Sequence, residues 1–184
     1  LSLFNINQND DYGVIEVGMD KKGEIDQLSK IIQPDISVIT NINYAHAKNF
    51  KNIRQIALAK AEIINNTKDN GYVVLNADDA FFGLHKKIAH KKKIKVLSFG
   101  ISNQYADIKL HNVIKSKKKY KICIKINKIK KNFIVSNNFQ NHIYNILASL
   151  TVKSIFFDIS KLDKNIFFDF KTCLLYTSDA ADDM

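Results

Sequence analysis

The sequence predicts an α/β fold, in which a mostly parallel sheet with flanking helices is joined to a small antiparallel sheet. Before Gly100, short apolar runs alternate with segments of helical periodicity, which is typical of βαβ units. After Gly100, three β-rich segments follow one another with connections too short for helices, which is typical of an antiparallel meander. With 184 residues, 46% of them hydrophobic, the chain is long enough for one main core.

The elements expected before Gly100 form a parallel sheet. Apolar runs at residues 12–17 and 36–42 predict two strands, and residues 24–32 between them have the periodicity of a helix. Because both runs are rich in apolar residues and neither contains a lysine, we expect strands that are buried on both faces. The remaining elements expected in this part are a helix over residues 52–65, a strand over residues 72–75, a helix over residues 79–90 and a strand over residues 94–99.

The part after Gly100 is predicted to be antiparallel and then helical. Its expected elements are strands over residues 107–114, 120–126 and 129–135 and a helix over residues 140–152. Ser160, followed by Asp163, is typical of the residues that cap a helix, so one more short helix is expected there.

Both ends of the sequence indicate a fragment. Leu1 is not an initiator methionine, and the chain opens directly into a strand-like pattern. Residues 173–184 abruptly lose the lysine and isoleucine bias and resemble a translated sequencing adaptor. We therefore expect residues 1–172 to be part of one domain and residues 173–184 to be a non-native tail; the alternative is a genuine acidic tail.

The net charge of +10 does not by itself indicate a nucleic-acid-binding protein. Arginine is the preferred residue for bidentate phosphate and base contacts, and Arg54 is the only arginine. We therefore expect a solvated lysine surface and no nucleic-acid partner. The alternative from a different functional class is a basic RNA-binding module that uses the lysines of residues 91–93, 117–119 and 128–131.

Cysteine content and hydropathy indicate the compartment. Cys123 and Cys173 have neither the spacing of a zinc site nor that of a disulfide framework, which favours a reducing, cytoplasmic location. No stretch approaches the roughly 20 apolar residues of a membrane span, so no membrane association is expected.

Glu16 stands out because it interrupts an apolar run near the expected carboxyl end of a strand. A carboxylate in such a place is costly unless it meets a cation or hydrogen-bond donors. Ligands bind at the carboxyl ends of strands in open parallel sheets, and Mg²⁺ prefers oxygen ligands. Glu16 is thus a candidate metal ligand; the alternative is an edge glutamate that faces water.

Lys60 and His46 are the other two candidates. Lys60 falls on the apolar face of the helix expected over residues 52–65, so its side chain must snorkel to solvent, pair, or lose its charge. Burial lowers a lysine pKa, and a neutral amine reacts with carbon dioxide to give a carbamate. His46 follows the expected strand at residues 36–42, which places it either at the same sheet edge as Glu16 or on the surface.

These residues lie in four motifs whose order and spacing resemble those of the Mur ligases. Residues 14–25 resemble the glutamate motif of the family, and the form E-x-G-x-x-x-x-G-E-I within them, at residues 16–25, is similar to that of the members that add D-alanyl-D-alanine. Residues 40–46 resemble the strand and histidine loop of the family, residues 59–63 the helix with a carbamylated lysine, and residues 76–79 the turn after the next strand.

A weaker resemblance continues into residues 141–148, which are similar to the helix start that contacts adenine. Asn145 matches the second asparagine of that pattern, whereas His142 stands where many members have the first. The resemblance covers about residues 1–172, and it implies the central, P-loop-like ATP-binding domain of the family.

The resemblance implies an ADP-forming ligase with ATP and Mg²⁺ as cofactors. ATP would activate a carboxylate as an acyl phosphate, which an amine then attacks. Glu16 would hold one Mg²⁺, His46 and carbamylated Lys60 would hold or orient a second near the γ-phosphate, and Asn145 would contact adenine. The implied substrates are UDP-N-acetylmuramoyl-tripeptide and D-alanyl-D-alanine, and we expect a monomer.

One part of the family pattern is absent from the sequence. Mur ligases carry a phosphate loop of the form G-x-x-G-K-[ST], which no segment of this chain matches. By the family layout we expect it upstream of Leu1, and the amine-binding domain after about Lys171, so this polypeptide alone should not catalyse ligation. Two alternatives within the enzyme class are a sibling Mur ligase that adds another amino acid and a folylpolyglutamate synthase. The Gly-Glu-Ile element at residues 23–25 disfavours both.

Overall fold

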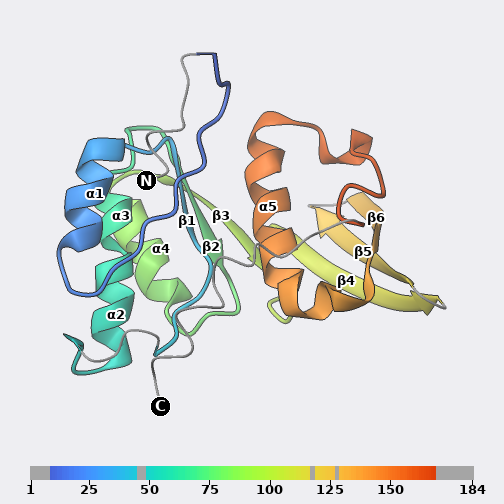
Figure 1. Ribbon diagram of the computed structural model, residues 1–184, viewed down its shortest axis with the longest axis horizontal. Helices are drawn as coiled ribbons and strands as arrows, with labels where there is room; N and C mark the ends of the chain where they lie inside the picture. Colours follow the sequence, from blue (N-terminus) through green and yellow to red (C-terminus); the bar gives the residue numbers. More distant parts are fainter. Residues whose placement is uncertain (1–8, 45–48, 117–118, 127–128, 169–184) are drawn as a thin grey trace. The chain divides into compact units, whose positions relative to one another are not determined.

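The structure is a computed structural model that describes residues 9–44, 49–116, 119–126 and 129–168 (Figure 1). The chain forms two compact units, Leu1–Phe99 and Gly100–Met184. The boundary between them coincides with the change of sequence pattern at Gly100.

The first unit contains a parallel sheet of three strands. These are β1 (Ile36–Ile39), β2 (Tyr72–Asn76) and β3 (Lys95–Gly100), with β2 paired to both of the others. Parallel neighbours need crossover connections, which are supplied here by α2 (Ile53–Lys60) and α3 (Glu62–Asn65), and then by α4 (Phe82–Lys91). The helix α1 (Glu24–Ile32) precedes β1. All four helices lie on the same side of the strands β1 and β2 (Figure 1).

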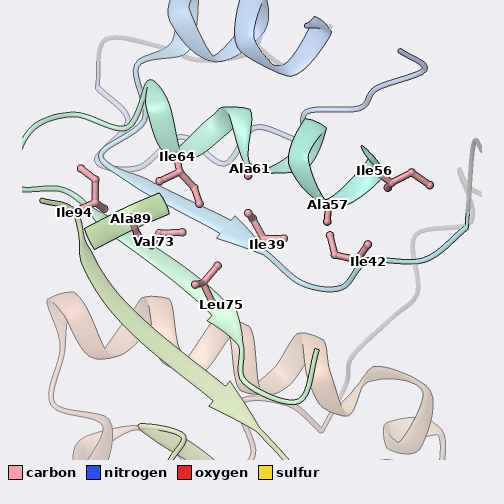
Figure 2. Close-up of a cluster of buried hydrophobic side chains, with 10 residues drawn as sticks. All are labelled: Ile39, Ile42, Ile56, Ala57, Ala61, Ile64, Val73, Leu75, Ala89 and Ile94. Atoms are coloured by element: carbon pink, nitrogen blue, oxygen red, sulfur yellow. The ribbon is translucent and has the colours of Figure 1, made fainter. Parts of the chain in front are cut away.

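The core of this unit lies between the strands and the helices α2, α3 and α4. Figure 2 shows the side chains of this core. Successive residues of a strand point to opposite faces, and Val73 and Leu75, two positions apart on β2, both point towards the helices. The cluster consists of Ile39, Ile42, Ile56, Ala57, Ala61, Ile64, Val73, Leu75, Ala89 and Ile94. In this core, Ala57 of α2 lies near Ile39 and Ile42 at the carboxyl end of β1, whereas Ile64 of α3 lies near its beginning (Figure 2).

The second unit contains an antiparallel meander and a long helix. Its strands are β4 (Ile108–Ser116), β5 (Lys119–Ile126) and β6 (Ile129–Val135), and β5 pairs with both neighbours. The helix α5 (Ile143–Phe156) follows a 3₁₀ helix, η3 (Asn137–His142), and contacts β4. On one face of β5, Ile122 and Ile124 are fully buried. The predicted fold class, α/β with an attached antiparallel sheet, is confirmed.

The strand predicted over residues 12–17 is wrong. These residues form an irregular extended segment, and Val14 is 94% exposed. A strand needs a neighbour that accepts its backbone hydrogen bonds, and among the described residues no strand pairs with this segment. An apolar run indicates the propensity to form a strand but not the presence of that neighbour. Glu16 therefore does not lie at the end of a strand here.

Other differences concern the ends of helices. The single helix predicted over residues 52–65 is interrupted at Ala61, which separates α2 from α3. The helix predicted to begin at Ser160 is wrong: the structure has a 3₁₀ helix, η4 (Ile159–Lys161), and Asp158 is its cap. The Asp158 carboxylate accepts a hydrogen bond from the Ser160 N–H at 3.0 Å, so the capping acceptor stands two residues earlier than predicted.

Within the described residues, the structure contains no helix that is both long and apolar enough to cross a membrane.

Candidate functional site

Lys60 ends α2 at the carboxyl end of β1. Its side chain is half-buried, and its Nζ donates a hydrogen bond to the backbone carbonyl oxygen of Asn41 at 3.0 Å. Asn41 stands two residues after the end of β1. Of the outcomes expected for a lysine on the apolar face of a helix, the structure shows partial burial with a backbone carbonyl as partner.

The surroundings of Lys60 change its ionisation. Burial lowers the pKa of its ammonium group, and the negative charge of Asp79 partly opposes this by raising the pKa. A lower pKa increases the fraction of neutral amine, which is the form that reacts with carbon dioxide. The position is therefore chemically suited to a carbamate.

Asp79 fixes the backbone on the other side of the same edge. It follows β2, and its Oδ2 accepts a hydrogen bond from the backbone N–H of Ile42 at 2.8 Å. Its Oδ1 accepts one from the backbone N–H of Phe81, also at 2.8 Å, just before α4 begins. Lys60 and Asp79 thus both hold the first residues after β1, at the edge where open parallel sheets bind ligands.

His85 lies beneath this edge on α4. Its imidazole is buried, and Nε2 is 3.0 Å from the carbonyl oxygen of Ala57, so Nε2 carries the proton in that bond. Burial lowers the pKa of His85; the bond to Ala57 and the charge of Asp79 raise it, and the charge of Lys60 lowers it further. The histidine joins α4 to α2 close to Lys60.

Glu16 is exposed and lies in the extended segment that leads to a tight turn. In this turn the carboxylate of Glu24 accepts hydrogen bonds from the backbone N–H groups of Asp20 at 2.6 Å and Lys21 at 3.0 Å. The side-chain amide of Asn49 donates to the Asp20 carboxylate at 3.0 Å. The segment after Glu16 is thereby joined to the segment that follows the predicted histidine loop.

The two remaining predicted residues are His46 and Asn145. His46 falls outside the described residues. Asn145 lies in the first turn of α5, in the second unit, and its side chain is exposed. Among the residues that the structure describes, no three or more His, Cys, Asp and Glu side chains converge as metal ligands would. The roles of Glu16, His46, Lys60 and Asn145 in binding therefore stay predictions.

Sequence reasoning assigned no role to Asp79 or His85. Asp79 was visible only as part of the turn at residues 76–79, although an acidic residue just after a buried strand is a signal for the ligand-binding edge. The spacing of His85 from Phe81 and Ala89 places all three on one helical face, and that spacing was the available signal for its burial.

The fold is that of an α/β domain with a candidate ligand-binding edge, and comparison with known proteins identifies the family. Residues 1–153 match the Mur ligase middle domain. The chain therefore belongs to the Mur ligase family, whose members are ATP-dependent ligases.

Curated relatives narrow the resemblance to one branch of the family. A UDP-N-acetylmuramoyl-tripeptide–D-alanyl-D-alanine ligase of Buchnera aphidicola subsp. Acyrthosiphon pisum is 39% identical over 117 residues, which cover 60% of this chain and 25% of the relative. The ligase of the same name from Bacillus subtilis is 30% identical over 156 residues, which cover 85% of this chain and 32% of the relative. The chain thus spans about a quarter to a third of the length of these relatives.

Solved structures agree on the fold. The MurF ligase of Thermotoga maritima, solved in complex with ADP, superposes with a TM-score of 0.74 at 24% identity and covers 89% of this chain and 38% of that one. MurF of Acinetobacter baumannii gives a TM-score of 0.73 at 23% identity, with 83% of this chain and 32% of that one covered.

Proposed function

We propose that the chain is the central part of an ATP-dependent ligase that joins D-alanyl-D-alanine to UDP-N-acetylmuramoyl-tripeptide during synthesis of the peptidoglycan precursor. The observation that carries the proposal is the half-buried Lys60 at the carboxyl end of β1, in a chain that belongs to the Mur ligase family. The names of the relatives from Buchnera and Bacillus support D-alanyl-D-alanine as the amine substrate.

The donor set fits Mg²⁺ in its chemistry. The Glu16 carboxylate and a carbamate on Lys60 would both offer the hard oxygen atoms that Mg²⁺ prefers, and His46 would hold or orient the second ion. Bound Mg²⁺ would supply neutralisation of charge around the phosphoryl group that leaves ATP. Asn145 would contact the adenine.

The environment of Lys60 sets the conditions for its carbamate. The neutral amine favoured by burial is the reactive form, so the lowered pKa promotes the reaction with carbon dioxide. Once formed, the carbamate is an anion near the carboxylate of Asp79, and two neighbouring negative charges repel each other. We therefore infer that a divalent cation stabilises the carbamate.

Incubation with ¹³C-labelled bicarbonate tests the carbamate directly. We expect a carbamate resonance in the ¹³C NMR spectrum that strengthens with added Mg²⁺ and disappears in Lys60→Arg, because a guanidinium stays protonated. Lys68→Arg is the matched control, since Lys68 is exposed and pairs with Asp35 at 2.9 Å. A resonance that persists unchanged in Lys60→Arg would assign the carbamate to another amine, a different lysine or the α-amino group, and remove this support.

The amine substrate is tested in the complete ligase that contains this chain. With ATP, Mg²⁺ and UDP-N-acetylmuramoyl-tripeptide, we expect release of ADP that depends on D-alanyl-D-alanine. Release that depends instead on a single amino acid would favour a sibling ligase, and release with a folate and glutamate would favour a folylpolyglutamate synthase. Lys60→Arg should lower kcat by about 100-fold or more, as expected on losing a group that stabilises transition-state charge.

A further inference from the structure

The amino terminus of α1 lacks a cap of its own. The first N–H groups of a helix have no partner within the helix, and the residue before it usually supplies a side-chain acceptor. That residue is Gly23, with φ of 92°, a left-handed conformation that favours glycine and offers no side chain. Gly23 therefore leaves these N–H groups open to an acceptor from another part of the chain.

Glu62, the first residue of α3, supplies this acceptor. Its carboxylate oxygens lie 3.1 Å from the backbone nitrogen of Gly23, and its Oε2 accepts a hydrogen bond from the backbone N–H of Asp26 at 3.2 Å. Glu62 is half-buried, and α1 and α3 lie side by side (Figure 1). A negative charge at this end of a helix is also favoured by the helix dipole.

The position of Glu62 joins two predicted parts of the site. Glu62 stands two residues after Lys60, and Gly23 closes the turn that follows the Glu16 segment. Glu24 closes the same turn through the backbone N–H of Asp20 at 2.6 Å. The carboxylate of Glu62 therefore ties α3, which begins two residues after Lys60, to the turn that follows the Glu16 segment.

A second contact between the same two helices does not reach this turn. Asn66, just after α3, donates hydrogen bonds from its side-chain amide to the Asp26 carboxylate at 2.9 Å and to the Ser29 hydroxyl at 2.9 Å. Its loss loosens the packing of α1 on α3 while the bond to Gly23 remains. Asn66→Ala is thus the matched control, because it tests whether loosening the packing of α1 on α3 alone has the effect expected of Glu62.

We propose that Glu62 is a positioning residue, which sets the Glu16 segment in register with Lys60 for phosphoryl transfer. The proposal rests on the ligase function proposed above. It assigns Glu62 no direct contact with nucleotide or metal.

The first test is independent of activity and uses NMR of this chain. We expect Glu62→Ala to shift the amide resonances of Val17 and Gly18 and the ¹³Cε resonance of Lys60. Glu62→Gln keeps one accepting oxygen and should shift them less; it also decides the question if Glu62→Ala fails to fold. Asn66→Ala should leave them in place. Unchanged resonances in the Glu62 variants, or equal shifts in Asn66→Ala, would overturn the proposal.

The second test uses the complete ligase. Glu62→Ala should lower kcat by about 10- to 100-fold, as expected for a small misplacement of reacting groups. The KM for ATP should change little, Glu62→Gln should restore part of kcat, and Asn66→Ala should keep it. An equal loss of kcat in Asn66→Ala would show that Glu62 acts only through the packing of α1 on α3, and would contradict the proposal. If the unmodified ligase releases no ADP with D-alanyl-D-alanine, the proposed function fails, and the NMR comparison still decides the role of Glu62.

Discussion

At the edge of the parallel sheet, the pKa values of Lys60 and His85 are lowered chiefly because burying a charged group is costly. His85 is buried in the folded chain, and burial is the largest cause that lowers its pKa. In the unfolded chain the same imidazole titrates near its ordinary pKa of about 6.5. The folded state therefore binds fewer protons than the unfolded state in the interval just below that value.

This difference makes stability depend on pH. The stabilisation linked to neutral His85 is fully present above about pH 6.5 and is lost as the pH falls from there towards the lowered pKa. We expect His85→Gln to flatten the free energy of unfolding against pH between about 7 and 5, as measured by urea unfolding. His90→Gln, at an exposed position on the same helix, is the control and should keep the slope of the unmodified chain. An unchanged slope in His85→Gln would contradict the assignment.

Among the elements, the turn before β2 is limited by space. A Cβ atom at Gly71 would lie 2.6 Å from the carbonyl oxygen of Asp35 and 2.8 Å from that of Lys68, and both are backbone atoms that cannot rotate away. We expect Gly71→Ala to lower the free energy of unfolding by about 1–3 kcal/mol, as overpacking does. Thermal unfolding measures the change.

Gly83 is the matched control for this substitution. It lies within α4, and a Cβ atom there meets nothing within 4 Å. Gly83→Ala should raise the free energy of unfolding by about 0.5–1 kcal/mol because alanine loses less backbone entropy in a helix. Equal effects at the two positions would show that the turn adapts to a Cβ atom.

The antiparallel sheet contains a row of like charges. In the register of its strands, Lys125 stands opposite Lys109 on β4 and Lys130 on β6. Like charges directly opposite each other are unfavourable, so Lys125→Glu should raise the free energy of unfolding by about 0.2–1 kcal/mol. Denaturation in urea checks this, and the gain should shrink in high salt.

Lys121 provides the comparison on the same strand. It is also exposed but stands opposite Ile114 and Ile134, so Lys121→Glu creates no new ion pair in the row. A gain of the same size in both variants would indicate a general effect of the net charge of +10 rather than of this row.

For the whole molecule, the decisive feature is the lack of a phosphate loop. No segment of the 184-residue sequence has the form G-x-x-G-K-[ST], the motif whose backbone amides and lysine hold the phosphates of ATP in the family pattern. We expect no turnover by this polypeptide alone in a coupled assay of ADP release. The complete ligase under the same conditions is the positive control, and release by the 184-residue chain that depends on D-alanyl-D-alanine would refute the expectation.

Much of the fold was predictable because it depends on local pattern. The helices α1 and α4 and the strands from residue 36 onward follow from periodicity, and their ends differ from the predicted ends by a few residues. Before α4, for example, the Asp79 side chain accepts a hydrogen bond from the Phe81 N–H, and the helix begins only at Phe82. The segment at residues 12–17 was mispredicted because strand formation needs a neighbouring strand, which no local pattern reveals.

The site divides in the same way. The sequence by itself determined the family, the order of its motifs, and the anomaly of Lys60 on an apolar helical face, because residue types and spacing are written in it. Only the tertiary structure decided that Lys60 meets the carbonyl of Asn41, that Asp79 holds Ile42, and that Glu62 caps α1. These contacts join residues that are 19 to 37 positions apart in the chain, and their geometry exists only after the sheet and helices have packed.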